Sequence, residues 1–504
     1  MRVRAPELPQ ANPWLNTPSP LSLKALRGQV VILDFWTYGC INCLHVLPDL
    51  KFLEQTYGPQ LVVIGVHTAK FEHESDAASV QAAIARYQIS HLVLVDCDRS
   101  LWDQYAIKAW PTFVVIDPQG YVVATLAGEG QRPALEALVQ RLITARPDGA
   151  AADPAGPVFS LPPALPTPLA FPGKVLADPE SDTLFIADSG HHRIVITRLD
   201  GTLVAVVGSG QAGWRDGDES LAQFSSPQGM ALDLQQQRLY LADTGNHRLR
   251  QIDLASHQVS TLAGTGTQSR ILFPHGGKAL ETALNSPWDL VQVGKTIYIA
   301  MAGSHQIWQM DLAQDTVQTF MGTGAEFCVD GPPEVAAFAQ PSGLATDGQH
   351  LFVADSETSS IRAIALTTPP QVKTLCGSGD LFEFGDVDGV GNQVRLQHCL
   401  GLTQAAGTLW IADTYNHKVK RLDPTTGTCQ TLFGQGQAGL QEGAGTAALF
   451  SEPAGVTAAH EYLYVADTNN HAIRRLHLPS LAVTTLALPQ LCSPQVCWPD
   501  FSKS

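Results

Sequence analysis

The sequence predicts an α/β domain followed by an all-β propeller with six blades. Three observations support this prediction. Strand-like and helix-like stretches alternate between residues 21 and 143, a proline-rich stretch follows, and a segment of the ADTNNH type then recurs six times. A chain of 504 residues is also too long for one ordinary hydrophobic core, so two or more domains are expected.

Composition and charge narrow the possible functions. The chain has 44% hydrophobic and only 15% charged residues, and its 43 glycines and 33 prolines indicate many turns and short strands. Its net charge of −16 disfavours nucleic acid and anionic membranes as partners, because both are negatively charged. The N-terminal residues lack the apolar core of a secretory signal and no apolar run is long enough to span a membrane, so we expect a cytoplasmic protein.

The first domain, which we place at residues 1–146, is expected to contain a mixed sheet covered by helices. Apolar runs of strand length occur at VVILDFW, LVVIGVH and HLVLVD (residues 30–36, 61–67 and 91–96), and helical patterns fill the two gaps between them. Two further strands, TFVVID and YVVATLAG, are joined by the turn PQG and form a hairpin. The helix PALEALVQRLI closes the domain.

A linker is predicted at residues 147–172. This stretch contains eight prolines, with several alanines and glycines between them. Such a composition favours extended, semi-rigid conformations and does not build a core.

The remainder of the chain repeats one unit, and we expect a six-bladed propeller over residues 173–490 with a short tail at 491–504. Most copies of the ADTNNH segment follow an element of the type PQGMALD and precede one of the type VSTLAGTG, which gives four short strands per repeat. Two ways to close the ring stay open, since either VTTLAL (483–488) or VFSL (158–161) can supply the last strand. The six copies are LFIADSGHHRI (184–194), LYLADTGNHRL (239–249), IYIAMAGSHQI (297–307), LFVADSETSSI (351–361), LWIADTYNHKV (409–419) and LYVADTNNHAI (463–473).

One face of the propeller is predicted to carry the function of this part of the chain. In a blade of four alternating strands, the turn between the second and third strands shares a face with the blade-to-blade connection. The connections are long, as in GWRDGDESLAQFSSP (213–227), whereas the turns on the other face are short. Long loops on a rigid scaffold often bind partners, so we expect a protein partner at the long-loop face.

Two cysteines three residues apart, Cys40 and Cys43, lie in the string TYGCINCLH. A structural zinc site would need His45 and a distant ligand, because no second C-x-x-C occurs, and Leu44 occupies the histidine position that c-type haem requires. The pair follows an apolar strand and starts a helix, where unpaired N–H groups and the helix dipole stabilise a thiolate. We therefore expect redox chemistry, with Cys40 as the nucleophile and Cys43 as the resolving cysteine.

The string LDFWTYGCINC resembles the active-site strand and helix of the thioredoxins, whose common form is VDFWAxWCGPC. The resemblance places Asp34 at the family's buried aspartate, the proton acceptor for the second cysteine. Pro111, in WPT before a strand, falls at the family's cis-proline, which helps to bind extended substrate backbone. Ile41 and Asn42 replace Gly-Pro, and no lysine occurs where one is expected to pair with the buried aspartate.

The whole chain resembles the NHL-repeat-containing proteins that begin with a thioredoxin-like domain. The motifs GVHTAKFE, CINC and ADTxNHxI, the last behind a proline-rich linker, carry this resemblance. It implies a thioredoxin-like domain fused to a six-bladed NHL propeller, and a thiol–disulfide oxidoreductase that uses an external thiol reductant and has a protein partner on the propeller. We expect no cofactor and no metal.

Three other hypotheses stay open. The chain is alternatively a binding scaffold whose first domain no longer turns over, or a propeller enzyme with a metal ion in its axial channel. It is also alternatively a peroxidase-like thiol enzyme, because Thr37-x-x-Cys40 matches half of the peroxiredoxin motif, although Leu33 stands where that motif needs proline.

Several other polar residues have simpler structural explanations. We expect the repeated histidines to form hydrogen bonds within their own turns and the repeated aspartates to accept bonds from turn N–H groups. His45 is expected at the surface and Cys97 in the core, while His67 and Lys70 are close to the cysteine pair in sequence. Cys492 and Cys497 are tail residues or a second redox pair. The repeated residues are His192, His247, His305, His417, His471, Asp188, Asp243, Asp355, Asp413 and Asp467, and blade three has Met301 in place of the aspartate.

Overall fold

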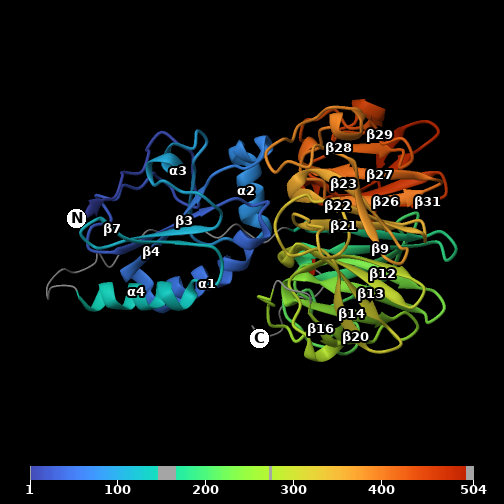
Figure 1. The fold of residues 1–504 in the computed structure, drawn as a ribbon, viewed down its shortest axis with the longest axis horizontal. Helices are drawn as coiled ribbons and strands as arrows, with labels where there is room; N and C mark the ends of the chain where they lie inside the picture. Colours follow the sequence, from blue (N-terminus) through green and yellow to red (C-terminus); the bar gives the residue numbers. More distant parts are fainter. Residues whose placement is uncertain (1, 146–165, 272–274, 495–504) are drawn as a thin grey trace. The chain divides into compact units, whose positions relative to one another are not determined.

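The structure, a computed structural model, describes residues 2–145, 166–271 and 275–494 (Figure 1). The chain divides into two compact units, Met1–Ala164 and Leu165–Ser504. The first is the expected α/β domain, and the second is the expected propeller with six antiparallel sheets. Most of the predicted linker and most of the predicted tail, including Cys497, lie outside the described residues.

The first unit is built on one mixed sheet of seven strands in the order β1-β7-β6-β3-β4-β5-β2. The central strand β3 (Val30–Trp36) runs parallel to β4 (Leu61–His67) and antiparallel to β6 (Thr112–Ile116). The edge strands β1 and β2 were not predicted, because two residues show no periodicity. The remaining strands are β1 (Val3–Arg4), β2 (Trp14–Leu15), β5 (Leu92–Val95) and β7 (Tyr121–Ala127).

Helices cover both faces of this sheet. The even-numbered residues of β3 pack with Val46 and Leu50 of α1 and with Leu135 of α4, and the odd-numbered residues pack with Leu101 and Trp102 of α3. Because Asp34 has the same parity as Val30 and Ile32, its side chain lies on the α1 face. The helices are α1 (Ile41–Tyr57), α2 (Ala77–Arg86), α3 (Ser100–Gln104) and α4 (Arg132–Thr144).

The second unit has six blades, and each is made of four consecutive antiparallel strands. The first strands of neighbouring blades contact one another around the ring, which places them nearest the axis. Blades one to three consist of β8 (Val175–Asp178), β9 (Thr183–Asp188), β10 (Arg193–Arg198) and β11 (Leu203–Val207); β12 (Pro227–Asp233), β13 (Arg238–Asp243), β14 (Arg248–Asp253) and β15 (Val259–Ala263); and β17 (Pro287–Val293), β18 (Thr296–Met301), β19 (Gln306–Asp311) and β20 (Thr316–Met321). Blades four to six consist of β21 (Pro341–Thr346), β22 (His350–Asp355), β23 (Ser360–Ala365) and β24 (Gln371–Cys376); β26 (Gly401–Ala405), β27 (Thr408–Asp413), β28 (Lys418–Leu422) and β29 (Thr428–Phe433); and β31 (Pro453–Ala459), β32 (Tyr462–Asp467), β33 (Ala472–His477) and β34 (Ala482–Thr485).

Three connections between blades add a fifth strand that was not predicted. These strands, β16 (Gly276–Lys278), β25 (Gly389–Val390) and β30 (Gly443–Ala444), pair with the outermost strand of the blade that follows. They cover an edge that would otherwise present unpaired N–H and C=O groups.

The repeated histidines join neighbouring blades, which corrects the expectation that they bond within their own turns. Each turn already closes its own backbone hydrogen bond, for example from His247 N to Thr244 O. The imidazole Nδ1 instead accepts a bond from a backbone N–H at the start of the next blade. In blade four, which has no histidine at this position, the hydroxyl of Ser359 is the acceptor. The donor and acceptor pairs are Ser226 to His192, Ser286 to His247, Gln340 to His305, His398 to Ser359, Glu452 to His417 and Phe171 to His471.

The ring closes without exchanging a strand, because β34 completes blade six from within its own repeat. The alternative strand VFSL lies outside the described residues. The closing junction has the same bonds as the others: Phe171 N donates to His471 Nδ1 at 3.1 Å, and Thr468 Oγ1 donates to Pro172 O at 2.8 Å. Phe171 is buried in the propeller, although it was predicted in the linker. The propeller therefore begins before residue 173, where a proline-rich composition concealed a structured segment.

The repeated aspartates also have partners other than the predicted ones. Asp243 Oδ1 accepts a bond from Ser225 N in the preceding connection, and its Oδ2 pairs with the buried guanidinium of Arg250 at 2.8 Å. Equivalent cations are Arg362, Lys420 and Arg474 in blades four to six, and Arg193 in blade one. In blade three the aspartate and the cation are both replaced: Met301 Sδ accepts the connection N–H, and Trp308 takes the place of the cation.

Candidate functional site

The C-x-x-C pair lies where β3 leads into α1. Cys40 is the N-cap residue of α1, in extended conformation, and no side chain caps this helix end. Its carbonyl accepts bonds from Cys43 N at 3.1 Å and Leu44 N at 3.3 Å, so the first turn forms around the two cysteines. Cys40 is partly exposed and Cys43 is fully buried, and both are free thiols in this structure. An accessible first thiol and a shielded second thiol are the arrangement that disulfide exchange needs.

Asp34 is buried on the same face of the sheet as α1. Neither of its carboxylate oxygens has a hydrogen-bond partner among the described residues. Burial raises the pKa of Asp34 from 3.8 to about 8. Burial also raises the pKa of the Cys43 thiol, with further contributions from a hydrogen bond to Cys40 and from the negative charge of Asp34. Two buried acids that influence each other in this way can share a proton.

Replacing Asp34 by asparagine is expected to stabilise the first unit at neutral pH. The folded state binds a proton on Asp34 up to about pH 8, whereas the unfolded chain releases it near pH 3.8, so stability falls as pH rises between these values. Removing the carboxyl group should recover up to roughly 4 kcal/mol at pH 7. Hydrogen exchange of the β3 amides in the full chain from pH 5 to 9 measures this opening free energy.

Asp117→Asn is the matched control for this experiment, because Asp117 is a buried carboxylate in the turn at the other end of the sheet. If Asp34→Asn left the pH dependence of β3 opening unchanged, the raised pKa would be refuted.

Pro111 lies beside the end of β3 from which the cysteine loop starts. It immediately precedes β6, where Thr112 pairs with Phe35, and its peptide bond with Trp110 is cis. Its carbonyl accepts a bond from Gly128 N at 2.8 Å, and the Trp110 ring contacts the Trp102 ring at 4.4 Å. The four residues expected to form the site, Asp34, Cys40, Cys43 and Pro111, thus all belong to β3, its α1 junction and the start of the neighbouring strand.

His67 packs behind the cysteine loop. It pairs in register with Trp36 across β3 and β4, and its ring contacts those of Trp36 at 5.0 Å and Tyr38 at 5.4 Å. Burial lowers the pKa of His67 to about 3, which keeps the ring neutral at physiological pH. Neither ring nitrogen has a hydrogen-bond partner within the described ranges. His67 therefore supports Trp36 and Tyr38 as a neutral packing element.

Glu74 is a further residue near the site that was not predicted, because a glutamate in a helical or loop stretch is usually exposed. Here it is fully buried, in the short 3-10 turn Glu72–Ser75. Its Oε1 accepts a bond from Gly39 N at 3.0 Å. The only signal in the sequence is its position shortly after β4, at the carboxyl end of the sheet where sites form in α/β folds.

The structure also places the secondary candidates. His45 bonds Glu129 through Nδ1 at 2.7 Å, with its side chain 7% exposed, so it is not the surface residue that was expected. The nitrogen of Lys70 lies over the Phe71 ring. Cys97 is exposed, which corrects the expected core position, because it lies in the turn beyond the end of β5. Cys492 is disulfide-bonded in the structure, and Cys497 is outside the described residues.

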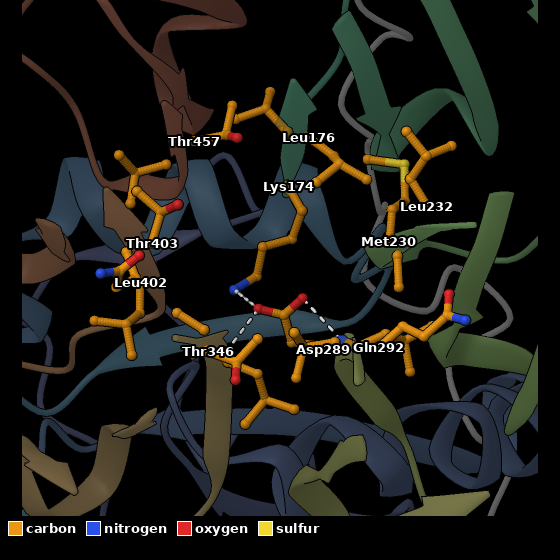
Figure 2. A pocket seen from close by; sticks show the side chains of 18 residues that line it. Lys174, Leu176, Met230, Leu232, Asp289, Gln292, Thr346, Leu402, Thr403 and Thr457 are labelled. Atoms are coloured by element: carbon orange, nitrogen blue, oxygen red, sulfur yellow. Dashed lines mark hydrogen bonds and ion pairs between the residues drawn. The ribbon is translucent and has the colours of Figure 1, made fainter. Parts of the chain in front are cut away.

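The axis of the propeller contains a cavity of about 280 Å³ lined by the first strands of all six blades (Figure 2). Lys174 from blade one reaches across it and bonds Asp289 of blade three at 3.0 Å, Ser342 O at 2.8 Å and Leu400 O at 2.5 Å. At this repeat position the other four blades have glycine (Gly229, Gly343, Gly401 and Gly455). A Cβ on Gly401 would approach Ala454 O to 2.0 Å, so only blades one and three have room for a side chain here.

The hypothesis of a propeller enzyme with a metal ion in this channel is not supported by a cluster of ligands. Over the described ranges, no group of three or more His, Cys, Asp or Glu side chains is arranged to hold a metal ion. The one carboxylate that projects into the cavity at this level, Asp289, is already paired with Lys174 and accepts a bond from Leu344 N at 3.0 Å.

Some of the long connections between blades carry an exposed large apolar side chain. Trp214, Phe327 and Leu440 are 63%, 60% and 56% exposed and lie on three different connections. These connections bond to the turns between second and third strands, for example through Asn246 Nδ2 to Gly213 O, which places them on the face nominated for binding. Among the described residues, no helix has the length and apolar character needed to cross a membrane.

Comparisons with known proteins agree with this organisation. The thioredoxin-like family matches residues 28–122, and the NHL repeat family matches residues 224–252. The chain is 45% identical to the protein SUPPRESSOR OF QUENCHING 1, chloroplastic, of Arabidopsis thaliana, over 94% of this chain and 46% of that protein. A shorter match, to the thiol-disulfide oxidoreductase YkuV of Bacillus subtilis, shows 27% identity over 28% of this chain and 96% of that protein.

The chain therefore spans less than half of the plant relative. Its match to NHL repeat-containing protein 2 of Bos taurus is more complete: 42% identity over 95% of this chain and 71% of that protein. With a thioredoxin-like unit, a six-bladed propeller and this degree of identity, the chain belongs to the family of NHL repeat-containing protein 2.

Proposed function

We propose that this protein is a thiol–disulfide oxidoreductase that uses Cys40 and Cys43. The observation that carries the proposal is the combination of a partly exposed Cys40 at the start of α1 with a fully buried Cys43 and a buried Asp34 that has no hydrogen-bond partner in the described chain. The similarity to a thiol-disulfide oxidoreductase over part of the chain supports it. The nine cysteines are an odd number scattered over the whole chain, which is unlike a secreted disulfide framework, and we propose the cytoplasm.

The reaction is a two-step exchange. The Cys40 thiolate attacks one sulfur of the substrate disulfide, and the S–S bond breaks to release the other sulfur as a thiolate, which takes a proton from water. Cys43 gives its proton to the ionised carboxylate of Asp34 and attacks Cys40 Sγ. The second substrate sulfur leaves as a thiolate, and Cys40 and Cys43 are then a disulfide that an external thiol reductant returns to two thiols.

The value of about 8 for the pKa of Asp34 gives this reaction a pH dependence. Only the ionised carboxylate can accept the Cys43 proton, so the resolving step should accelerate as pH rises toward 8. Asp34→Asn should remove this acceleration.

We further propose that the propeller binds the protein that carries the substrate disulfide. Large exposed apolar side chains on three of the long blade connections support this, since long loops on a rigid scaffold often carry binding residues. Docking there would raise the effective concentration of the substrate disulfide at Cys40. Under the scaffold hypothesis the propeller would still bind the partner protein, but the first unit would no longer carry out disulfide exchange.

Trapping tests both halves of the proposal in the full chain. Cys43→Ser should form a stable mixed disulfide through Cys40, because no thiol remains to resolve it. The measurement is the yield of mixed disulfide with a defined peptide disulfide and with proteins of a cell extract, separated without reducing agent. The double variant Cys40→Ser/Cys43→Ser is the control, and equal yields from the two would exclude the exchange mechanism.

A surface variant separates docking from chemistry. Adding Phe327→Ser and Leu440→Ser to Cys43→Ser should leave trapping of the peptide disulfide unchanged and remove part of the trapped protein set. Identical trapped proteins in identical yields would leave the exchange mechanism intact and exclude the connection face as the docking site.

A further inference from the structure

The carboxylate of Glu74 connects the cysteine loop to the loop that follows β4. Its Oε1 accepts a bond from Gly39 N at 3.0 Å, and its Oε2 accepts bonds from Lys70 N at 2.8 Å and Phe71 N at 3.0 Å. The side chain is fully buried. Burying a carboxylate is costly unless hydrogen bonds compensate it, and three backbone donors supply this compensation.

The bond to Glu74 meets the cysteine loop directly before α1. Gly39 immediately precedes Cys40, and the backbone bond that closes this turn, from Cys40 N to Thr37 O, is long at 3.4 Å. No side chain caps the N-terminus of α1. The Glu74 carboxylate thus connects Gly39, the residue next to the nucleophile, to the backbone of Lys70 and Phe71 in the loop that follows β4.

We propose that Glu74 is a positioning residue for Cys40. By holding the N–H of Gly39, it sets the direction in which Cys40 Sγ leaves the α1 N-terminus and so aligns the thiolate with the incoming disulfide. This inference rests on the proposed exchange reaction. Glu74 itself transfers no proton and touches no substrate.

The geometry predicts how substitutions of Glu74 act. In Glu74→Gln the side chain has one acceptor oxygen, and its NH2 group would meet a backbone N–H donor on the other side, either at Gly39 or at Lys70 and Phe71. The change Glu74→Asp would keep the charge but shorten the side chain by one methylene, so the carboxylate could not reach both loops at the present distances. Both changes should loosen the cysteine loop.

The test compares Glu74→Gln with Asp117→Asn in the full chain. Asp117 is also a buried carboxylate that accepts backbone N–H bonds, from Gln119 and Tyr121, but it lies at the end of the sheet away from Cys40. The measurements are the rate of reduction of a small aromatic disulfide from pH 6 to 9, the reduction potential of the cysteine pair, and hydrogen exchange of β3 as a record of folding.

Glu74→Gln should lower the rate about tenfold or more at every pH and shift the reduction potential, while β3 exchange remains within the range of Asp117→Asn. A rate and a potential equal to those of Asp117→Asn would overturn the positioning role. If Glu74→Gln does not fold, the same rate of disulfide reduction is measured for Glu74→Asp. A rate below that of the wild type supports the positioning role, and a rate equal to that of the wild type overturns it. A wild-type protein without disulfide reduction would instead refute the proposed function itself.

Discussion

Replacing Cys40 by serine is expected to abolish disulfide reduction by the full chain. A serine hydroxyl is not ionised near neutral pH and is a far weaker nucleophile toward sulfur than a thiolate. Cys43 cannot take its place, because it is fully buried and burial raises the pKa of its thiol. We expect a loss of at least about 1,000-fold in the rate of insulin reduction at pH 7.

The control for this experiment is Cys97→Ser. Cys97 is an exposed free thiol of the same unit, in a turn after β5. Its replacement should leave the rate unchanged. Activity that persisted in Cys40→Ser and disappeared in Cys97→Ser would show that the nucleophile has been assigned to the wrong cysteine and would require a different mechanism.

Replacing Lys174 by methionine is expected to destabilise the propeller by about 3–5 kcal/mol. Methionine has a similar length and no charge, so the carboxylate of Asp289 would stay buried without its counter-ion. The carbonyl groups of Ser342 and Leu400 would also lose their donor. Urea unfolding of the full chain, followed by the fluorescence of propeller tryptophans, measures the change in the free energy of unfolding.

A double variant identifies the cause. Lys174→Met/Asp289→Asn removes both charges, so most of the stability lost in the single variant should return. A single variant less than about 1 kcal/mol below wild type would show that water replaces the ammonium group without cost. A double variant as unstable as the single one would show that packing, and not the unpaired charge, dominates.

The sequence was sufficient for the architecture because the relevant signals are local. Apolar runs marked β3, β4 and β5, and the ADTNNH segments marked the turn of each blade. The redox pair was also recognisable, since Cys40 and Cys43 lie in one helical turn after an apolar strand. Asp34 was placed by resemblance, and the structure adds the burial that raises its pKa.

The missed features depend on contacts between distant parts of the chain. His471 bonds the N–H of a residue that precedes it by 300 positions, so no local pattern could name its partner. Lys174 and Asp289 replace glycines at one position of the repeat, and aligning the first strands of the blades would have revealed them as an opposite pair. Glu74 gave no such signal, because the N–H donors of Gly39, Lys70 and Phe71 that it accepts from are backbone groups, which every residue except proline provides.

The junction between blades six and one bears on which blade the chain must build first. His471 and Thr468 hold Phe171 and Pro172 with the same two hydrogen bonds by which His192 and Ser189 hold Ser226 and Pro227. The junction that closes the ring is thus chemically the same as the junction between blades one and two, and it does not depend on the first and last strands of the propeller being chain ends. In terms of topology, the starting point of the propeller is arbitrary, and a circularly permuted order of the blades would close through the same kind of joint.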